Sequence, residues 1–314
     1  MAKHLICLTI DTDPDGLSGL ATRRDASDFT CLAGLDKFPH FLDRELGEAI
    51  PITWFIRIDN QIKDFFGDEL FLIRTFNTFW DAVIGLNHEL AWHPHLYKYD
   101  KIKDEYVLYD SVEEAIDELS SLHVVMKSAH LNFKTFRNGE AWLHPRVFEL
   151  LESYGYETDS SVISGRIVND NSLKNWEHAP DQAYFPLNKN LSQVGPKREM
   201  LEIPISTWFT IAPYDKIPKR RYLNPAIHST IFEQAISRLK IREEMSGTSL
   251  QIWNFISHPD DIVARDKSRD LLYARSVESY ADNVRLFKSF LEGFGHEVEF
   301  ATLQNAAKIW RAMN

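Results

Sequence analysis

The feature that most constrains the fold is an alternation of short apolar runs with amphipathic helical patterns along the whole chain of 314 residues. Leu5–Ile10 and Leu250–Ile256 are apolar enough for strands buried on both faces. Ser111 and Glu114 have the spacing of a helix capping box, and apolar residues follow on one face as far as Met126. Such an alternation predicts an α/β fold with a mainly parallel sheet.

Seven or eight strand–helix units fit a (β/α) barrel better than an open doubly wound sheet, which is the alternative. No glycine-rich phosphate-binding motif follows any expected strand, so neither a dinucleotide site nor a P-loop is predicted. No Pro/Gly/Ser-rich linker divides the chain, and we therefore expect residues 1–314 to form one domain with a long loop at 164–200. The expected strands are Leu5–Ile10, Ile52–Ile58, Glu89–Trp92, Phe133–Arg137, Thr158–Ile163, Leu201–Ile205, Leu250–Ile256 and Val298–Ala301.

The net charge of the chain limits the classes of molecule that it can bind. The chain has 35 Lys and Arg against 46 Asp and Glu, a net charge of −11, which argues against a nucleic-acid or anionic-membrane binder. The basic segment Lys216–Arg221 is expected to be a solvated loop, with contact to the phosphate of a nucleotide sugar as the alternative. No stretch approaches the roughly 20 apolar residues of a membrane span. The apolar run that ends at Asp11 is too short for a secretion signal, so we expect a cytoplasmic protein.

Polar side chains follow several expected strands at the point where each strand ends. Asp11 and Asp13 follow the first strand, His93 and His95 the third, and Arg137 the fourth. The carboxyl ends of parallel strands open on one face, which carries the active site in such folds. We therefore expect carboxylates, imidazoles and a guanidinium to meet at one mouth.

The spacing of two residues within each pair of candidate ligands favours a metal site. Residues two apart in an extended segment point to the same side, which applies to Asp11 with Asp13 and to His93 with His95. One carboxylate and two imidazoles leave open positions on a Zn²⁺-like ion, as in hydrolytic sites. His258 follows the strand Leu250–Ile256 and is a candidate general acid, with Asp260 or Asp261 orienting its ring.

Taken in order, these segments resemble the polysaccharide deacetylases of the NodB-homology type (carbohydrate esterase family 4), in a divergent cytoplasmic branch. The resemblance covers nearly the whole chain. The segments that carry it are Leu8–Asp13, Ile52–Ile56, Asn87–His95, Phe136–Gly139, Leu150–Tyr156 with Asp159–Ser161, Ser257–Pro259 and Phe300–Leu303.

The resemblance implies a distorted (β/α) barrel and a reaction, the hydrolysis of an N-acyl group on a sugar. Asp11 would be the general base, tethered by Arg137, and His258 the general acid. Asp13 with His93 and His95 would hold one divalent ion, most simply Zn²⁺. The substrate would be a carbohydrate or a sugar precursor of surface-polysaccharide synthesis.

The chain departs from the family pattern at three places. Thr12 separates the two aspartates, which are adjacent in the common form. The second metal histidine usually follows the first by four residues, which would make Tyr97 the ligand here; we assign the role to His95, with His88 as the other alternative. Asn138-Gly139 stands where the family has Pro-Tyr.

Two other functions remain possible from the sequence. One is a catalytically silent carbohydrate-binding relative, and the other is a C–N hydrolase of a small nitrogenous compound. Aromatic residues expected near the mouth, Trp92 and Trp142 above all, favour a sugar as the bound substrate.

Overall fold

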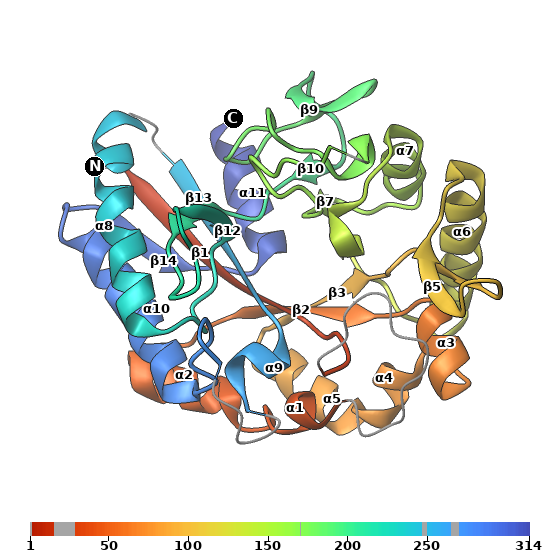
Figure 1. Cartoon of the computed structure of the whole chain (residues 1–314), viewed down its shortest axis with the longest axis horizontal. Helices are drawn as coiled ribbons and strands as arrows, with labels where there is room; N and C mark the ends of the chain where they lie inside the picture. The colour runs from red at the N-terminus through yellow and green to blue at the C-terminus, as the bar shows by residue number, and fades with distance from the viewer. Residues whose placement is uncertain (1, 16–28, 170, 247–249, 265–269) are drawn as a thin grey trace.

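The computed structural model describes residues 2–15, 29–169, 171–246, 250–264 and 270–314 (Figure 1). At the centre of these residues lies a parallel sheet of eight strands in the order β10-β7-β6-β3-β2-β1-β13, with β14 paired to β1. The strands are β1 (Lys3–Asp11), β2 (Ile52–Arg57), β3 (Glu89–His93), β6 (Thr135–Phe136), β7 (Thr158–Asp159), β10 (Leu201–Glu202), β13 (Leu250–Ser257) and β14 (Glu297–Phe300).

Strand β1 is the middle of the fold, and its side chains are buried from His4 to Asp11. Along one edge β1 pairs with β13 from Lys3 to Ile10. Two strands share its other edge, β14 beside Lys3–Ile6 and β2 beside Leu8–Asp11. An apolar run buried on both faces is what a central parallel strand needs, and this explains why the run is nearly uninterrupted.

The sheet curves until its two ends meet. The Ser206 amide, in the segment after β10, donates to the carbonyl oxygen of Asn254 on β13 at 3.0 Å. The Asn254 side-chain amide donates in return to the carbonyl oxygens of Ile203 and Pro204, at 3.1 and 3.2 Å. These bonds close the sheet through irregular backbone rather than a regular ladder, so the structure is a distorted (β/α) barrel, as the sequence predicts.

Helices cover the outside of the sheet, with α6 and α7 on the right of Figure 1 and α8 and α10 on the left. The N-cap predicted for α6 is present, since the Ser111 hydroxyl accepts from the Glu114 amide. The helices are α1 (Thr30–Ala33), α2 (Phe38–Leu46), α3 (Asn60–Phe66), α4 (Phe71–Thr75), α5 (Asn77–Gly85), α6 (Val112–Ser128), α7 (Pro145–Ser153), α8 (Ser229–Ser246), α9 (Pro259–Ile262), α10 (Val277–Glu292) and α11 (Leu303–Met313), with 3₁₀ turns at Gly139–Ala141 and Ser172–Lys174.

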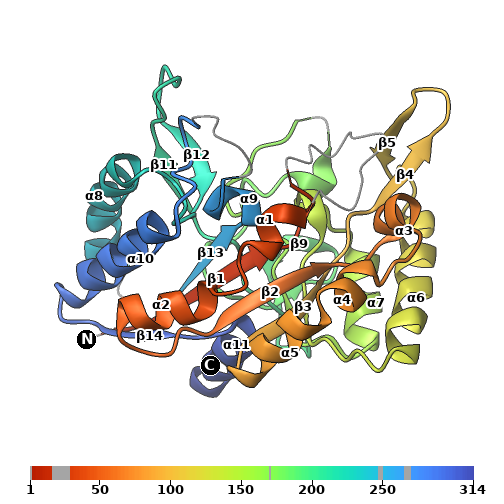
Figure 2. The same cartoon turned by 90° about the horizontal axis from the view of Figure 1, so that it is seen from below.

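Three antiparallel hairpins add to the barrel, and the sequence did not predict them. They are β4 (Tyr97–Asp100) with β5 (Glu105–Leu108), β8 (Pro186–Leu187) with β9 (Asn190–Val194), and β11 (Thr207–Thr210) with β12 (Lys219–Tyr222). The hairpins β4–β5 and β11–β12 project at the top of Figure 2, on opposite sides of the barrel.

The hairpins correct two expectations. The segment 164–200 is not one long loop, because it contains β8 and β9, and Lys216–Arg221 is not a plain loop, because Lys219 begins β12. The strands expected at 133–137, 158–163 and 201–205 are each only two residues long in the parallel sheet. Among the described residues, no helix is both long enough and apolar enough to cross a membrane.

Candidate active site

The ends of β1, β3, β6 and β13 bring the candidate residues to one cavity of about 250 Å³. Each side chain stands at or just beyond the carboxyl end of its strand, where the parallel arrangement leaves room above the sheet. The candidate residues that line the cavity from these strand ends are Asp11, Asp13, His93, His95, Arg137 and His258.

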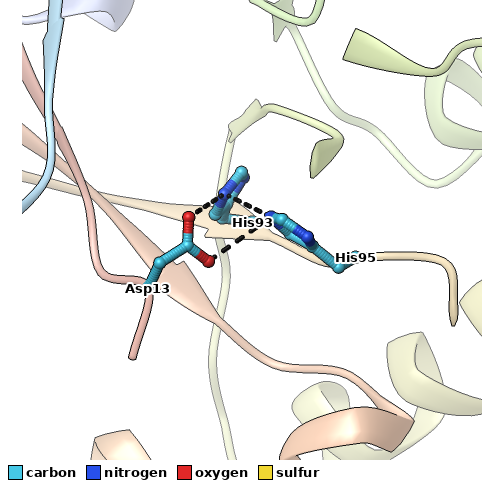
Figure 3. A group of neighbouring side chains, drawn as sticks. All are labelled: Asp13, His93 and His95. Atoms are coloured by element: carbon cyan, nitrogen blue, oxygen red, sulfur yellow. Dashed lines mark hydrogen bonds and ion pairs between the residues drawn. The ribbon is translucent and has the colours of Figure 1, made fainter. Parts of the chain in front are cut away.

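Asp13, His93 and His95 offer three ligand atoms within 4.8 Å of one another (Figure 3). The two imidazole Nε2 atoms are 3.2 Å apart. Asp13 Oδ1 lies 3.4 Å from His95 Nε2, and Asp13 Oδ2 lies 3.7 Å from His93 Nε2. Ligands at tetrahedral angles around Zn²⁺ lie about 3.3 Å apart, given metal–ligand distances of about 2.0–2.1 Å. The spacing therefore fits a divalent ion held by these three side chains.

The two histidines are set up to present Nε2 to an ion. His93 Nδ1 hydrogen-bonds the carbonyl oxygen of Arg137 at 2.8 Å, so it carries the proton and leaves the Nε2 lone pair free. For His95, burial and the charge of Arg57 outweigh the nearby carboxylate of Asp13, and its pKa lies well below the ordinary value. The His95 imidazole is therefore neutral at neutral pH, the form that binds metals.

His88 and Tyr97, the two alternatives to His95 as a ligand, do not line the cavity. His88 is buried, and its Nδ1 accepts from Trp54 Nε1 at 3.1 Å, away from the cavity lining. The Tyr97 ring packs beside that of His95, with 5.6 Å between centroids, and Tyr97 does not line the cavity. Of the three candidates for this ligand, the geometry therefore favours His95.

Asp11 is held by Arg137 beside the cluster of Asp13, His93 and His95. Arg137 Nη1 donates to Asp11 Oδ1 at 2.6 Å, and Asp11 Oδ2 lies 3.5 Å from His93 Nε2. The guanidinium is fixed in turn by Ser160, whose carbonyl oxygen and hydroxyl accept at 3.0 and 2.9 Å. Both side chains are almost fully buried, so Asp11 has one defined orientation, with one oxygen facing the cavity.

Thr12 explains how an inserted residue leaves both aspartates facing the cavity. Its amide and its hydroxyl both donate to the carbonyl oxygen of Phe55 on β2, at 2.9 and 3.0 Å. Thr12 is thereby fixed on the side of β2. Asp11 and Asp13, one residue to either side of it, both line the cavity.

Arg57 and Asp59 also belong to the site, although no sequence pattern at a strand end predicted them. Arg57 is fully buried and donates to Asp13 Oδ1 at 2.5 Å and to Asp59 Oδ2 at 2.6 Å. Asp59 Oδ2 also accepts the His95 amide at 2.9 Å. Burial opposes ionisation of Asp13, but the charge of Arg57 and a hydrogen bond with His93 hold its pKa well below the ordinary value. A charged residue within the apolar run Ile52–Ile58 was the available signal, because a buried charge needs a partner.

His258 stands on the other side of Asp13, as the N-cap residue of α9. Its Nε2 lies 3.4 Å from Asp13 Oδ2, and its Nδ1 lies 3.2 Å from Asp261 Oδ2. Asp261, rather than Asp260, thus orients the ring, and Asn224 anchors Asp261 with a bond of 2.9 Å. Burial lowers the pKa of His258, but the hydrogen bond to Asp261 and the surrounding carboxylates outweigh it and raise the pKa to about 10.

The two tryptophans expected at the mouth are in the hydrophobic core instead. Trp92 is 0% exposed, and its Nε1 donates to the carbonyl oxygen of Ile58 at 2.9 Å. Trp142 is 2% exposed and is absent from the cavity lining. Their placement as substrate-binding residues was therefore wrong. A lone tryptophan next to a strand end packs inward as readily as outward, and the sequence does not distinguish the two.

Comparison with known proteins supports the fold. No protein-family model matches the chain, and no curated protein sequence matches it. Among solved structures, the chain is similar to a Mycobacterium smegmatis protein assigned to the polysaccharide deacetylases, with a TM-score of 0.55 and 13% identity over 99% of this chain and 91% of that one. It is also similar to the PuuE allantoinase, with a TM-score of 0.57 and 11% identity over 98% of this chain and 90% of that one.

At such low identity the likeness shows the fold alone. The chain has the distorted (β/α) barrel of these structures, which confirms the fold expected from the NodB-type resemblance. A shared fold does not determine function, which depends on the residues of the site itself.

Proposed function

We propose that this chain is a metal-dependent deacetylase that hydrolyses an N-acyl group, most simply N-acetyl, of a sugar or sugar precursor in surface-polysaccharide synthesis. One observation supports this most strongly. A carboxylate fixed by Arg137, a cluster of one carboxylate and two imidazoles, and His258 all line one cavity. A base, a cation site and an acid around a common space are what amide hydrolysis requires.

Asp13, His93 and His95 would hold the divalent ion. Their donor set of one carboxylate oxygen and two imidazole nitrogens is typical of catalytic zinc sites that keep a position open. When bound, such an ion would lower the pKa of water and polarise the acyl group.

Asp11 is the general base in this proposal. Its oxygen Oδ2 faces the metal cluster, while Oδ1 is occupied by Arg137. A carboxylate with one free oxygen in the cavity can accept the proton of the attacking water. Arg137 is a positioning residue, because its hydrogen bond to Oδ1 fixes the direction of Oδ2.

His258 is the general acid. Asp261 accepts at Nδ1, which leaves the Nε2 hydrogen directed at the cavity. The raised pKa keeps the ring protonated at neutral pH. A protonated imidazole can give its proton to the departing amine nitrogen, which is a poor leaving group without it.

A second candidate is a C–N hydrolase of a small nitrogenous compound, because an allantoinase has the same barrel. The size of the space argues for a larger substrate. A further cavity of about 500 Å³ adjoins the site and shares three lining residues with it, which exceeds the room that a small compound needs. We therefore favour the sugar substrate.

The two candidates are separated by product analysis. The zinc-loaded protein is incubated with a panel of N-acetyl sugars and, separately, with allantoin and related cyclic amides. We expect acetate from the sugars, loss of this activity after chelation, and its return on adding Zn²⁺. Opening of the cyclic amides without any acetate release would establish the second candidate instead.

A further inference from the structure

A second cavity continues from the candidate active site along the barrel mouth. It measures about 500 Å³ and lies against the hairpin β11–β12. Ile163, Arg166 and Tyr222 line both this cavity and the catalytic one, so the two are parts of one cleft. A substrate whose amide lies at Asp13 can thus extend into the second part, which we call the arginine cleft.

The arginine cleft is positively charged in a chain that is strongly acidic. Arg166, Arg220 and Arg221 line it, and no Asp or Glu is among the described residues that do so. The whole chain has a net charge of −11. The lining of this cleft has the opposite sign of charge, because it contains three arginines and no carboxylate among the described residues. Such a cleft attracts an anion.

Arg220 is the guanidinium most available to a ligand. It donates to the Thr207 hydroxyl at 3.0 Å, and its guanidinium lies 4.8 Å from the centre of the Phe209 ring. A Cβ at Gly165 would lie 2.3 Å from Arg220 Nη1, so the guanidinium lies against glycine backbone. Within the described residues, no carboxylate lies within ion-pair distance of Arg220. Its side chain is held in place while its charge stays unpaired.

The other two arginines are partly neutralised. Arg221 forms an ion pair with Asp215 at 2.8 Å. Arg166 donates to the carbonyl oxygen of Glu140 at 2.9 Å, and the Glu140 carboxylate is bound more closely by Lys174, at 2.7 Å. These contacts fix the side chains at the wall, and Arg220 supplies most of the uncompensated charge.

Most of the remaining lining is apolar or aromatic and includes Trp208, Tyr222 and Tyr273, while Thr207, Thr210 and Asn224 are polar. Trp208 is 3% exposed, and its Nε1 has no acceptor among the described residues. A buried donor without an acceptor is costly, and a ligand oxygen would relieve that cost. The lining thus combines guanidinium donors with flat apolar walls.

We infer that the arginine cleft binds a phosphate ester, so that the substrate is an N-acyl sugar joined through phosphate to a nucleoside or a prenyl chain. The inference rests on the proposed deacetylase function and adds to it the class of substrate. Guanidinium groups recognise phosphate through charge-assisted, bidentate bonds. The apolar walls suit the group beyond the phosphate, and the shared lining places the sugar at the catalytic cavity.

Binding is tested without turnover, using glucose 1-phosphate, which has no amide. Calorimetry compares the protein with its Arg220→Gln and Arg44→Gln variants; Arg44 is a surface arginine beside Glu45 with a side chain 69% exposed. We expect Kd to rise roughly tenfold or more in Arg220→Gln, the cost of a lost charge-assisted bond, and to stay unchanged in Arg44→Gln. Absence of binding, or equal Kd values in all three proteins, overturns the inference.

Activity tests then separate the sources of the phosphate. Acetate release is compared for N-acetylglucosamine, its 1-phosphate, a nucleoside-diphosphate N-acetyl sugar and a short-prenyl diphosphate N-acetyl sugar. We expect kcat/KM for at least one phosphate-linked substrate to exceed that of the neutral sugar roughly tenfold, and Arg220→Gln to abolish the difference. Equal values overturn the inference and leave the deacetylase proposal standing. No acetate from any substrate, with glucose 1-phosphate still bound through Arg220, refutes the deacetylase proposal alone.

Discussion

The imidazole of His95 occupies the space that a side chain at position 139 would need. A Cβ on Gly139 would lie 2.0 Å from His95 Cδ2 and 2.3 Å from His95 Nε2. The glycine at position 139 and the position of His95 are therefore linked. The proposed metal ligands His93 and His95 are two residues apart, and the His95 ring lies where only a glycine at position 139 leaves room for it.

The Gly139→Ala substitution should therefore displace the His95 ring and weaken metal binding. We expect the zinc dissociation constant to rise at least about tenfold, as for the loss of a residue that orients a ligand. Gly85→Ala is the matched control, because a Cβ at Gly85 meets nothing within 4 Å. Zinc titration followed by calorimetry measures both variants. Unchanged affinity in Gly139→Ala would mean that His95 is not a ligand.

Substitutions at the site should separate metal binding from proton transfer. Asp13→Asn and the double variant His93→Ala/His95→Ala should lose the single bound ion. Asp11→Asn and His258→Gln should keep the ion and lose roughly 10²–10⁴-fold in kcat, the usual contribution of a general base or acid. Elemental analysis and acetate release measure the two properties. Full activity in Asp11→Asn would end the mechanism proposed here.

Arg57 should weaken the binding of a metal ion, and it should stabilise the metal-free protein. Its guanidinium is fully buried and forms ion pairs with both Asp13 and Asp59. In Arg57→Met, loss of a buried partner should cost about 3–5 kcal/mol of stability in the metal-free protein. Zn²⁺ should then raise Tm by more than it does in the wild type, because the ion replaces the missing charge. Thermal melts with and without Zn²⁺ measure this, and Arg74→Met, with a side chain 66% exposed, is the control. An equal Zn²⁺ effect in both proteins contradicts the prediction.

Stability should fall in mild acid because of two buried histidines. His4 Nδ1 accepts from Trp253 Nε1, and His88 Nδ1 accepts from Trp54 Nε1, so both rings are neutral when folded. Burial lowers the pKa of each to about 4 from an ordinary 6.5. The folded state binds fewer protons than the unfolded one in this range. The contribution of these two histidines to the free energy of unfolding is therefore complete above pH 6.5. It is lost as the pH falls from 6.5 towards 4, by up to about 1.4 kcal/mol per pH unit for each histidine.

The His88→Asn variant tests this, because its amide oxygen can still accept from Trp54 but does not titrate. Urea unfolding at pH 7.5 and pH 5 should show a loss of stability that is smaller in the variant by about 2 kcal/mol. His178→Asn, with a side chain 85% exposed, should behave like the wild type. Parallel losses in all three proteins would remove His88 as the cause.

Limited proteolysis tests whether residues 1–314 form one domain. β1 pairs directly with β13 and β14, so segments from both ends of the chain share one sheet. We expect no division into two stable halves, and any early cuts should fall in exposed loops such as those within 164–200. Two fragments that separate and remain folded would contradict the single domain.

Sequence patterns predicted the long elements and the strand-end residues, because both depend on local periodicity. β1, β13 and α6 lie close to their expected ranges, since each has a long apolar run or stripe. The lengths of the short strands β6, β7 and β10 were overestimated. In each case the apolar sequence continues beyond the residues that pair with a neighbouring strand. The partners of Arg57 and the buried positions of Trp92 and Trp142 depend on contacts between distant segments, which a local pattern does not contain.

The place of β1 in the sheet has a consequence for synthesis on the ribosome. β1 emerges first, yet β13 covers one edge of it and β14 half of the other, and these strands arrive in the last quarter of the chain. Until then an apolar strand has unpaired backbone along most of its length, a state open to association with other nascent chains. Because His258 directly follows β13, the strand that covers this edge also delivers the proposed acid. The nascent chain would thus complete its catalytic centre only as it loses its exposed edge.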